Sequence, residues 1–284
     1  MTKIISPAFL ALFLLFLMTT SARAERLLNA TAGIMKFDYT ETDVDGSFLD
    51  GEYGYIPGVE IDYRKSSADD STVGFSFAFY SGEVDYDGAL QDVSPPIDTN
   101  IDGLPFKTDT DETVFAITGF FSRKTPQIDP HLSLFGKITY KQWSRDIQGR
   151  FFSGFGNDNI YIDNQYIPGF SEVYTWLQLT LGLDYQLALS SGGSLQFNAG
   201  LLRTLNPEME ADFGVVTGNY DLQERWGYEA GITWLIPISP VARVGVAGNY
   251  TYWEFGRSNV VFGFVEPDSE SKMTTLKLVY QSKL

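Results

Sequence analysis

The stretch WLQLTLGLDYQL, residues 176–187, alternates strictly between apolar and polar side chains. Its odd-numbered positions run from Leu177 to Leu187 and are almost all leucine, whereas its even-numbered positions include Gln178 and Asp184. Successive side chains of a β-strand point to opposite faces, so this stretch predicts a strand with one apolar and one polar face. Which of the two faces lies inside the protein decides the fold.

Composition excludes several classes of site. The chain has 284 residues, no cysteine and one histidine, His131. It can therefore form no disulfide, thiol nucleophile, cysteine metal site or lipid anchor on cysteine, and no site that needs two imidazoles. Lys and Arg number 20 and Asp and Glu 36, for a net charge of −16, which argues against nucleic acid as a partner because its phosphates would be repelled.

Residues 1–24 are predicted to be a secretory signal peptide. Lys3 gives a positive start, residues 4–18 are mostly apolar, and Ala22-Arg23-Ala24 has the small-x-small pattern of a cleavage site. The apolar run is shorter than the ~20 residues of a spanning helix, which disfavours a membrane anchor. Residues 25–284 contain no apolar run long enough for such a helix and form the predicted folded domain.

The alternation recurs throughout the mature chain and predicts ten strands. They are residues 28–40, 54–65, 72–86, 112–123, 131–144, 172–187, 194–205, 224–236, 241–256 and 272–282. The connections alternate between short turns, such as 188–193, and long loops, such as 87–111. This pattern is typical of an all-β, ten-stranded antiparallel transmembrane β-barrel with short periplasmic turns and long outer loops, as in Gram-negative outer membranes.

In such a barrel the leucine face of 176–187 contacts lipid and the polar face lines the lumen. Trp226 and Trp234, at the two ends of one strand, then belong to aromatic girdles at the membrane interfaces. The predicted lumen network consists of Glu60, Asp62, Arg64, Lys137, Asp184, Glu229, Arg243 and Lys277. Ten strands enclose little space, so these charges are expected to pair, with Asp184 meeting Lys137, Arg243 or Lys277. A narrow ion path through them is the functional alternative, and an open diffusion pore is disfavoured.

The predicted outer loops are strongly acidic, and two segments approach the calcium-loop pattern D-x-[DN]-x-[DN]-G-x5-E. The candidate Ca²⁺ ligands are Asp98, Asn100, Asp102 and Asp109 in one segment and Glu41, Asp43, Asp45 and Glu52 in the other. Alternate oxygen ligands around a glycine turn suit Ca²⁺. Both segments depart from the pattern at one end and lack flanking helices, so a solvated loop that attracts ions remains the alternative.

The strand count and tall loops, with YKQWSRDIQG (140–149) and SSGGSLQFNAG (190–200), resemble the omptin family of outer-membrane peptidases. The resemblance is topological more than motif-based. It implies an acid pair after the third strand, where Asp85 and Asp87 stand as weak catalytic candidates. It also implies an Asp-x-His pair after the seventh strand, where this chain reads NPEMEADFG (206–214) and has no histidine. The family's catalytic base is absent from that position.

We therefore expect a monomeric, non-enzymatic integral protein of the bacterial outer membrane, with a structural or surface-interaction role through its acidic outer loops. Its expected partners are outer-membrane lipid and lipopolysaccharide, with the barrel assembly machinery during biogenesis. The last strand, MTTLKLVYQSKL (273–284), resembles the signal read by that machinery. Two alternatives stay open, namely an omptin-like peptidase with a diverged site and a narrow porin-like channel.

Overall fold

A computed structural model describes residues 25–89, 103–157, 159–214 and 216–284. The predicted signal peptide lies outside these residues. All the regular elements in the described part of the chain are β-strands. No helix there is long and apolar enough to cross a membrane.

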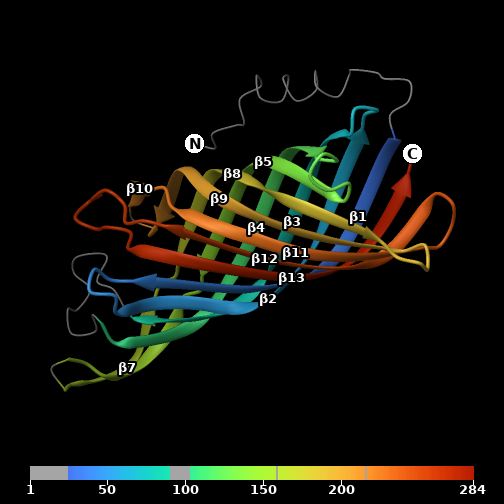
Figure 1. The fold of residues 1–284 in the computed structure, drawn as a ribbon. Helices are drawn as coiled ribbons and strands as arrows, with labels where there is room; N and C mark the ends of the chain where they lie inside the picture. The colour runs from blue at the N-terminus through green and yellow to red at the C-terminus, as the bar shows by residue number, and fades with distance from the viewer. Residues whose placement is uncertain (1–24, 90–102, 158, 215) are drawn as a thin grey trace.

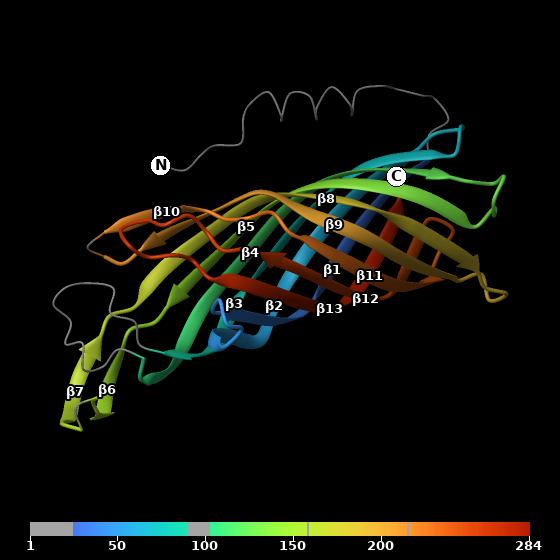
Figure 2. The ribbon, with the colours of Figure 1, turned by 60° about the vertical axis from the view of Figure 1, so that its left-hand side comes forward.

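Ten antiparallel strands form a closed barrel (Figures 1 and 2), as predicted. In barrel order they are β1 (Glu25–Thr42), β2 (Phe48–Ser66), β3 (Ser71–Ala89), β4 (Pro105–Lys124), β5 (Leu132–Ile147), β8 (Phe170–Ala188), β9 (Ser194–Asp212), β11 (Trp226–Pro237), β12 (Ala242–Phe255) and β13 (Asp268–Lys283). Pairing of β1 with β13 closes the ring, so every barrel strand has two neighbours. Closure removes the exposed edges that would otherwise leave backbone groups unpaired in lipid.

The two faces of the barrel are assigned as expected. In β8, Leu179, Leu181 and Leu183 are exposed on the outside, whereas Gln178 and Thr180 are buried inside. The other strands repeat this pattern and leave a band of exposed apolar side chains around the barrel. The opening stretch therefore has its leucine face outward, and its polar face lines the lumen.

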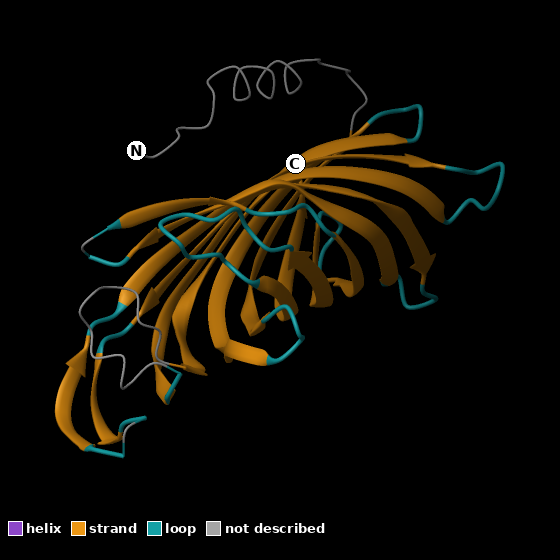
Figure 3. Ribbon diagram, turned by 90° about the vertical axis from the view of Figure 1, so that its left-hand side faces the viewer, coloured by secondary structure: helices purple, strands orange, loops and turns teal. Residues whose placement is uncertain are grey.

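The outer half of the barrel departs from the prediction, because most strands extend further than expected. Residues 145–171 were expected to be loop, yet they contain the end of β5, the hairpin β6 (Arg150–Phe155) with β7 (Tyr161–Ile167), and the start of β8. Likewise, β10 (Thr217–Asp221) pairs with the outer end of β9. Figure 3 shows the β6–β7 hairpin projecting from one end of the barrel. Beyond the membrane the outward face of a strand meets water and is polar, so the apolar outward positions that mark a membrane-spanning strand are lost.

An aromatic plug fills the lumen between the two ends. We define it as Phe37, Tyr39, Trp143, Tyr174, Trp176, Trp253 and Phe255, all nearly or completely buried. Trp143 of β5 stacks on Tyr174 of β8 at a centroid distance of 4.6 Å and meets Tyr39 of β1 edge-on at 4.8 Å. β1 and β8 lie five strands apart in the ring of ten, so these contacts cross its full diameter. The alternation of the strands predicted a polar lumen, and the plug departs from that prediction.

Truncating the plug should destabilise the barrel. Trp143→Ala removes a fully buried ring, and we expect it to lower the free energy of unfolding by about 3–5 kcal/mol. Urea unfolding in detergent micelles, followed by circular dichroism, measures the loss. Trp226→Ala, which removes an exposed lipid-facing ring, is the control, and an equal loss in both variants would contradict a special contribution from the plug.

Candidate functional site

Arg145, near the outer end of β5, organises the most strongly charged site of the described chain. Its guanidinium is buried and reaches the neighbouring strand β8 and, across the lumen, β1 and β2. Nη1 donates to Glu172 Oε2 of β8 at 2.7 Å and to Glu41 Oε1 of β1 at 3.1 Å, and Nε donates to Glu52 Oε2 of β2 at 3.0 Å. Strand alternation explains its inward direction, because Arg145 has the same parity as the lumen residue Lys137.

This site stands beyond the apolar band. On β5 the outward side chains Leu134 and Ile138 are apolar and exposed. Further along the strand, the outward positions become Ser144 and Asp146, which flank Arg145. A lipid-facing carboxylate at this level would be unfavourable, so we take the surroundings of Arg145 to lie outside the membrane.

Six buried carboxyl groups surround Arg145, and we call them the acid cluster. Its members are Glu41, Asp50, Glu52, Glu112, Glu172 and Glu266. One guanidinium cannot compensate six buried negative charges, so some members must hold protons. Burial raises the pKa of Glu172 to about 7, although Arg145 acts in the opposite direction.

Burial also raises the pKa of Asp50, Glu112 and Glu266 well above the ordinary range for carboxyl groups. Glu112 is hydrogen-bonded to Glu52, and both side chains are buried. Two carboxylates in contact cannot both be ionised, and the raised pKa of Glu112 assigns the proton to Glu112. Glu112 also accepts a hydrogen bond from the indole of Trp143, which links the acid cluster to the aromatic plug.

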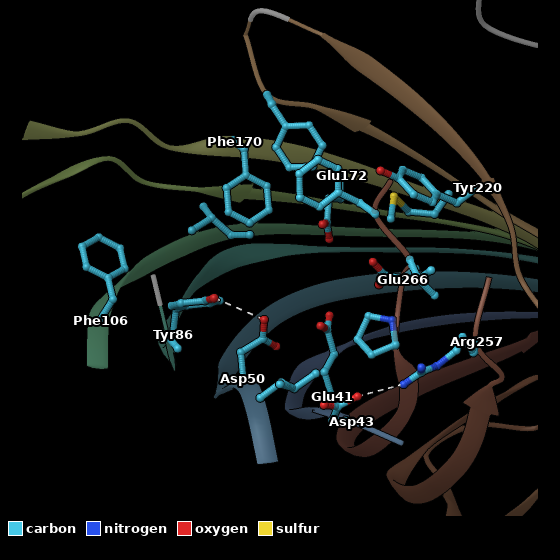
Figure 4. Close-up of a pocket in the computed structure, with 18 of the residues that line it drawn as sticks. Glu41, Asp43, Asp50, Tyr86, Phe106, Phe170, Glu172, Tyr220, Arg257 and Glu266 are labelled. Atoms are coloured by element: carbon cyan, nitrogen blue, oxygen red, sulfur yellow. Dashed lines mark hydrogen bonds and ion pairs between the residues drawn. The ribbon is translucent and has the colours of Figure 1, made fainter. Parts of the chain in front are cut away.

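An outer cavity of about 330 Å³ lies against the acid cluster. Figure 4 shows the carboxyl groups of Glu41, Asp50, Glu172 and Glu266 pointing into one space. Asp43 and Arg257 form an ion pair of 3.1 Å at its side. Its remaining lining residues are apolar or aromatic and are Leu49, Tyr86, Ala89, Phe106, Ile147, Ile167, Pro168, Phe170, Met209, Phe213, Tyr220, Phe264, Val265 and Pro267.

A second acidic feature lies on the outside of the barrel, and we call it the acidic wall. It consists of Glu83 and Asp85 on β3, Asp109 and Asp111 on β4, and Asp146 on β5, all exposed. The strand register sets Asp85 directly opposite Asp109, and sets Asp111 between Glu83 and Asp146. Like charges directly opposite in a sheet are destabilising, so this surface favours bound cations.

The two weak catalytic candidates lie on this outer face. Asp85 belongs to the acidic wall, and Asp87 pairs with Lys107 at 2.5 Å. On β3 it is the intervening residues Val84 and Tyr86 that point inward and are buried. Asp85 and Asp87 therefore do not face the outer cavity. His131 lies in the turn between β4 and β5, at the opposite end of the barrel.

The candidate calcium ligands do not come together in the described residues. Asp98, Asn100 and Asp102 lie outside them, and Asp109 belongs to the acidic wall. In the other segment Glu41 and Glu52 bind Arg145, Asp43 pairs with Arg257, and Asp45 accepts a hydrogen bond from the Ser47 amide. No group of three or more acidic side chains arranged around one metal position occurs in the described part of the chain.

The predicted lumen residues lie inside the barrel, mostly in ion pairs. Lys137 pairs with Glu229 at 2.5 Å, Lys277 with Glu60 at 2.9 Å, and Arg64 with Asp62 at 2.6 Å. Asp184 accepts a hydrogen bond from Gln196, rather than from any of the three expected cations. Arg243 lines a second cavity at the periplasmic end, beside His131.

Sequence reasoning missed most of the outer site. Arg145, Glu112 and Glu172 were not predicted as lumen residues, although each continues the inward parity of its strand. Arg145 lay one residue beyond a predicted strand and was assigned to a loop. Glu172 was the first residue of another predicted strand. Carrying the inward parity beyond residue 144 would have revealed Arg145.

Comparisons with known proteins identify the fold. No family model matches the chain, and no curated protein matches it. The outer membrane protease OmpT from Escherichia coli matches with a TM-score of 0.54 and 11% identity over 94% of this chain and 99% of that chain. The fold is that of a bacterial outer-membrane β-barrel.

Two smaller similarities involve other outer-membrane barrels. Neisserial surface protein A matches with a TM-score of 0.39 and 10% identity, over 92% of this chain and 99% of that chain. Ail of Yersinia pestis matches with a TM-score of 0.36 and 13% identity, over 90% and 99%. At these identities, the likeness to OmpT extends to the fold and not to its activity.

Stability should depend on pH through the acid cluster. The pKa of Glu172 is about 7 in the folded state against an ordinary 4.5, so between these values the native protein binds more protons than the unfolded chain. The free energy of unfolding is therefore expected to be highest below pH 4.5. It should fall as the pH rises through 7, by an amount on the order of 1–3 kcal/mol.

Urea unfolding in detergent micelles between pH 4.5 and 8 measures this slope. Glu172→Gln should flatten it, because the substituted side chain no longer titrates. Glu83→Gln removes an exposed carboxyl group from the same end of the barrel and is the control. Stability that rises with pH over this range in the unmodified protein would contradict the assignment.

Proposed function

We propose that this chain is an integral protein of the bacterial outer membrane with a non-enzymatic surface role. It binds cations or cationic partners through its acidic outer end. The barrel fold and the exposed apolar band support the location. In this setting outer-membrane lipid and lipopolysaccharide surround a monomeric barrel, and the barrel assembly machinery inserts it.

The observation that carries the surface role is the acidic wall. Asp85 and Asp109 are exposed and directly opposite each other, and Asp111 has Glu83 on one side and Asp146 on the other. The Gln148 amide donates long hydrogen bonds of 3.4 Å to Glu83 and 3.3 Å to Asp111, which compensate this repulsion only weakly. Cations, including Ca²⁺ and basic side chains, would relieve it and are the ligand class that the wall favours.

The peptidase alternative has less support. Asp85 and Asp87 lie on the outer face, away from the outer cavity, and His131 lies in a turn at the other end of the barrel. A hydrolytic site needs a base and a bound substrate within hydrogen-bond reach of each other. This separation favours a binding role for the outer end.

The aromatic plug, which crosses the lumen from β1 to β8, argues against the channel alternative. We expect the refolded protein to be electrically silent in a planar lipid bilayer, because fully buried, stacked rings occupy the lumen. The double variant Trp143→Ala/Trp253→Ala should open a path and give measurable conductance. Steady single-channel currents from the unmodified protein would contradict the prediction that the lumen is closed to ions.

Removing the central opposed pair tests the acidic wall. Asp85→Asn/Asp109→Asn should weaken binding of oligolysine or Ca²⁺, measured by calorimetry on micelle-embedded protein, by at least about tenfold, or roughly 1.4 kcal/mol. Binding to the unmodified protein should also weaken steeply with salt, because exposed charges are screened.

The matched control is Asp69→Asn/Asp70→Asn, which neutralises two exposed carboxyl groups in the turn between β2 and β3 at the periplasmic end. Its net charge equals that of the wall variant. Equal weakening in both double variants would mean that overall charge, and not the acidic wall, attracts the ligand. That result would contradict the proposed function.

A further inference from the structure

A buried carboxyl oxygen beside the outer cavity has no hydrogen-bond partner. Asp50 is only 5% exposed, and its Oδ2 accepts a hydrogen bond from Tyr86 at 3.2 Å. Its other oxygen, Oδ1, is buried and receives no hydrogen bond. Asp50 lines the cavity, as Figure 4 shows, and its unpartnered oxygen is covered beside that space. A buried acceptor without a donor is costly, and a donor supplied by a ligand would recover that cost.

The carboxyl groups around Asp50 make one side of the cavity acidic, so that this side favours positive charge. Glu41, Glu172 and Glu266 line the same space. Their protein donors are already shared, because the Tyr174 hydroxyl lies 2.6 Å from Glu266 Oε1 and 3.0 Å from Glu172 Oε2 and has one proton to donate. Arg145 is likewise divided between the glutamates of the acid cluster. A bound cation would therefore add charge compensation that the protein does not itself supply.

The walls of the cavity are of a different chemical kind. Phe106, Phe170, Phe213, Tyr220 and Phe264 are among the residues that enclose it. Aromatic faces attract cations and also cover apolar groups. A volume of about 330 Å³ is near the lower end of the roughly 300–1,000 Å³ typical of small-molecule sites. The space thus fits one ring or a short chain.

We propose that the outer cavity binds a small organic cation, with an ammonium or amidinium group on a short apolar or aromatic body. The charged group donates to Asp50 Oδ1 and lies against Glu172 and Glu266, and the body packs between the aromatic walls. This inference rests on the proposed cation-binding role but uses residues that the acidic wall does not contain. A hydrated metal ion would leave the aromatic walls unused, which favours an organic ligand.

Three probes, of which the two organic ones have the same shape, test the ligand class on the unmodified protein. 2-Phenylethylammonium supplies the charge and the ring, 2-phenylethanol supplies the ring alone, and Ca²⁺ supplies charge alone. Calorimetry on micelle-embedded protein should give the amine an affinity at least tenfold higher than that of the alcohol. Equal binding of the amine and the alcohol would overturn the proposal, because the carboxyl groups would then contribute nothing.

Variants locate the site. Asp50→Asn keeps the shape of the side chain and should lower the affinity for 2-phenylethylammonium at least tenfold, and Glu266→Gln should lower it in the same direction. Asp69→Asn, in the exposed turn between β2 and β3 at the other end of the barrel, is the matched control and should leave it unchanged. Gel mobility with and without heating checks that each variant is folded. If Asp50→Asn does not fold, Glu266→Gln alone decides the location.

The outcomes separate this inference from the proposed function. Loss of oligolysine binding in the acidic-wall variant, with amine binding retained, supports both. Amine binding that is unaffected by Asp50→Asn and Glu266→Gln overturns the cavity site and leaves the wall standing. Trilysine that competes with the amine and binds more tightly than it does would overturn the small-molecule assignment in favour of a basic peptide.

Discussion

The buried guanidinium of Arg145 is the charge on which the outer half of this barrel depends. It holds carboxyl groups of β1 and β2 across the lumen and one of the neighbouring strand β8. Its other contacts are aromatic, because it lies 4.5 Å from the ring centre of Tyr39 and 5.4 Å from that of Trp143. Arg145 is thus both the upper boundary of the aromatic plug and a support beneath the outer cavity. Removing one partner from a buried ion pair is strongly destabilising, so these parts depend on one another.

The membrane-spanning half of the fold could be predicted from the sequence. A strand such as 176–187 meets lipid on one face and a polar lumen on the other, so its chemistry alternates with period two. Above the membrane the outward positions meet water and become polar, so this pattern no longer marks the strand. β3 continues to Ala89 and β4 begins at Pro105, because strand pairing extends beyond the apolar outward positions. The hairpin of β6 and β7 was taken as loop for the same reason.

The candidate site was harder to predict than the fold. The alternation of side chains predicts that Glu41 and Glu52 point inward if their strands continue. It does not predict that both reach Arg145, which lies 93 residues or more further along the chain. Glu41 and Glu52 were predicted as Ca²⁺ ligands of one local loop, but they belong to two paired strands. Asp85 and Asp87 show the converse. They stand where the omptin family has its acid pair, but their positions along β3 direct both side chains away from the interior. Closure of the ring decides which inward residues meet.

The length of β3 has a consequence for how molecules reach the outer end. Its 19 residues, at roughly 3.3 Å each and a tilt near 40°, rise roughly 45 Å along the barrel axis. The apolar band of an outer-membrane barrel is only about 25 Å tall, which leaves about 20 Å of wall standing in water. A solute therefore arrives at the outer cavity by diffusion through the aqueous phase, and not sideways from the bilayer. Water-soluble compounds have the shorter route, whereas lipid-soluble ones first have to leave the membrane in which they accumulate.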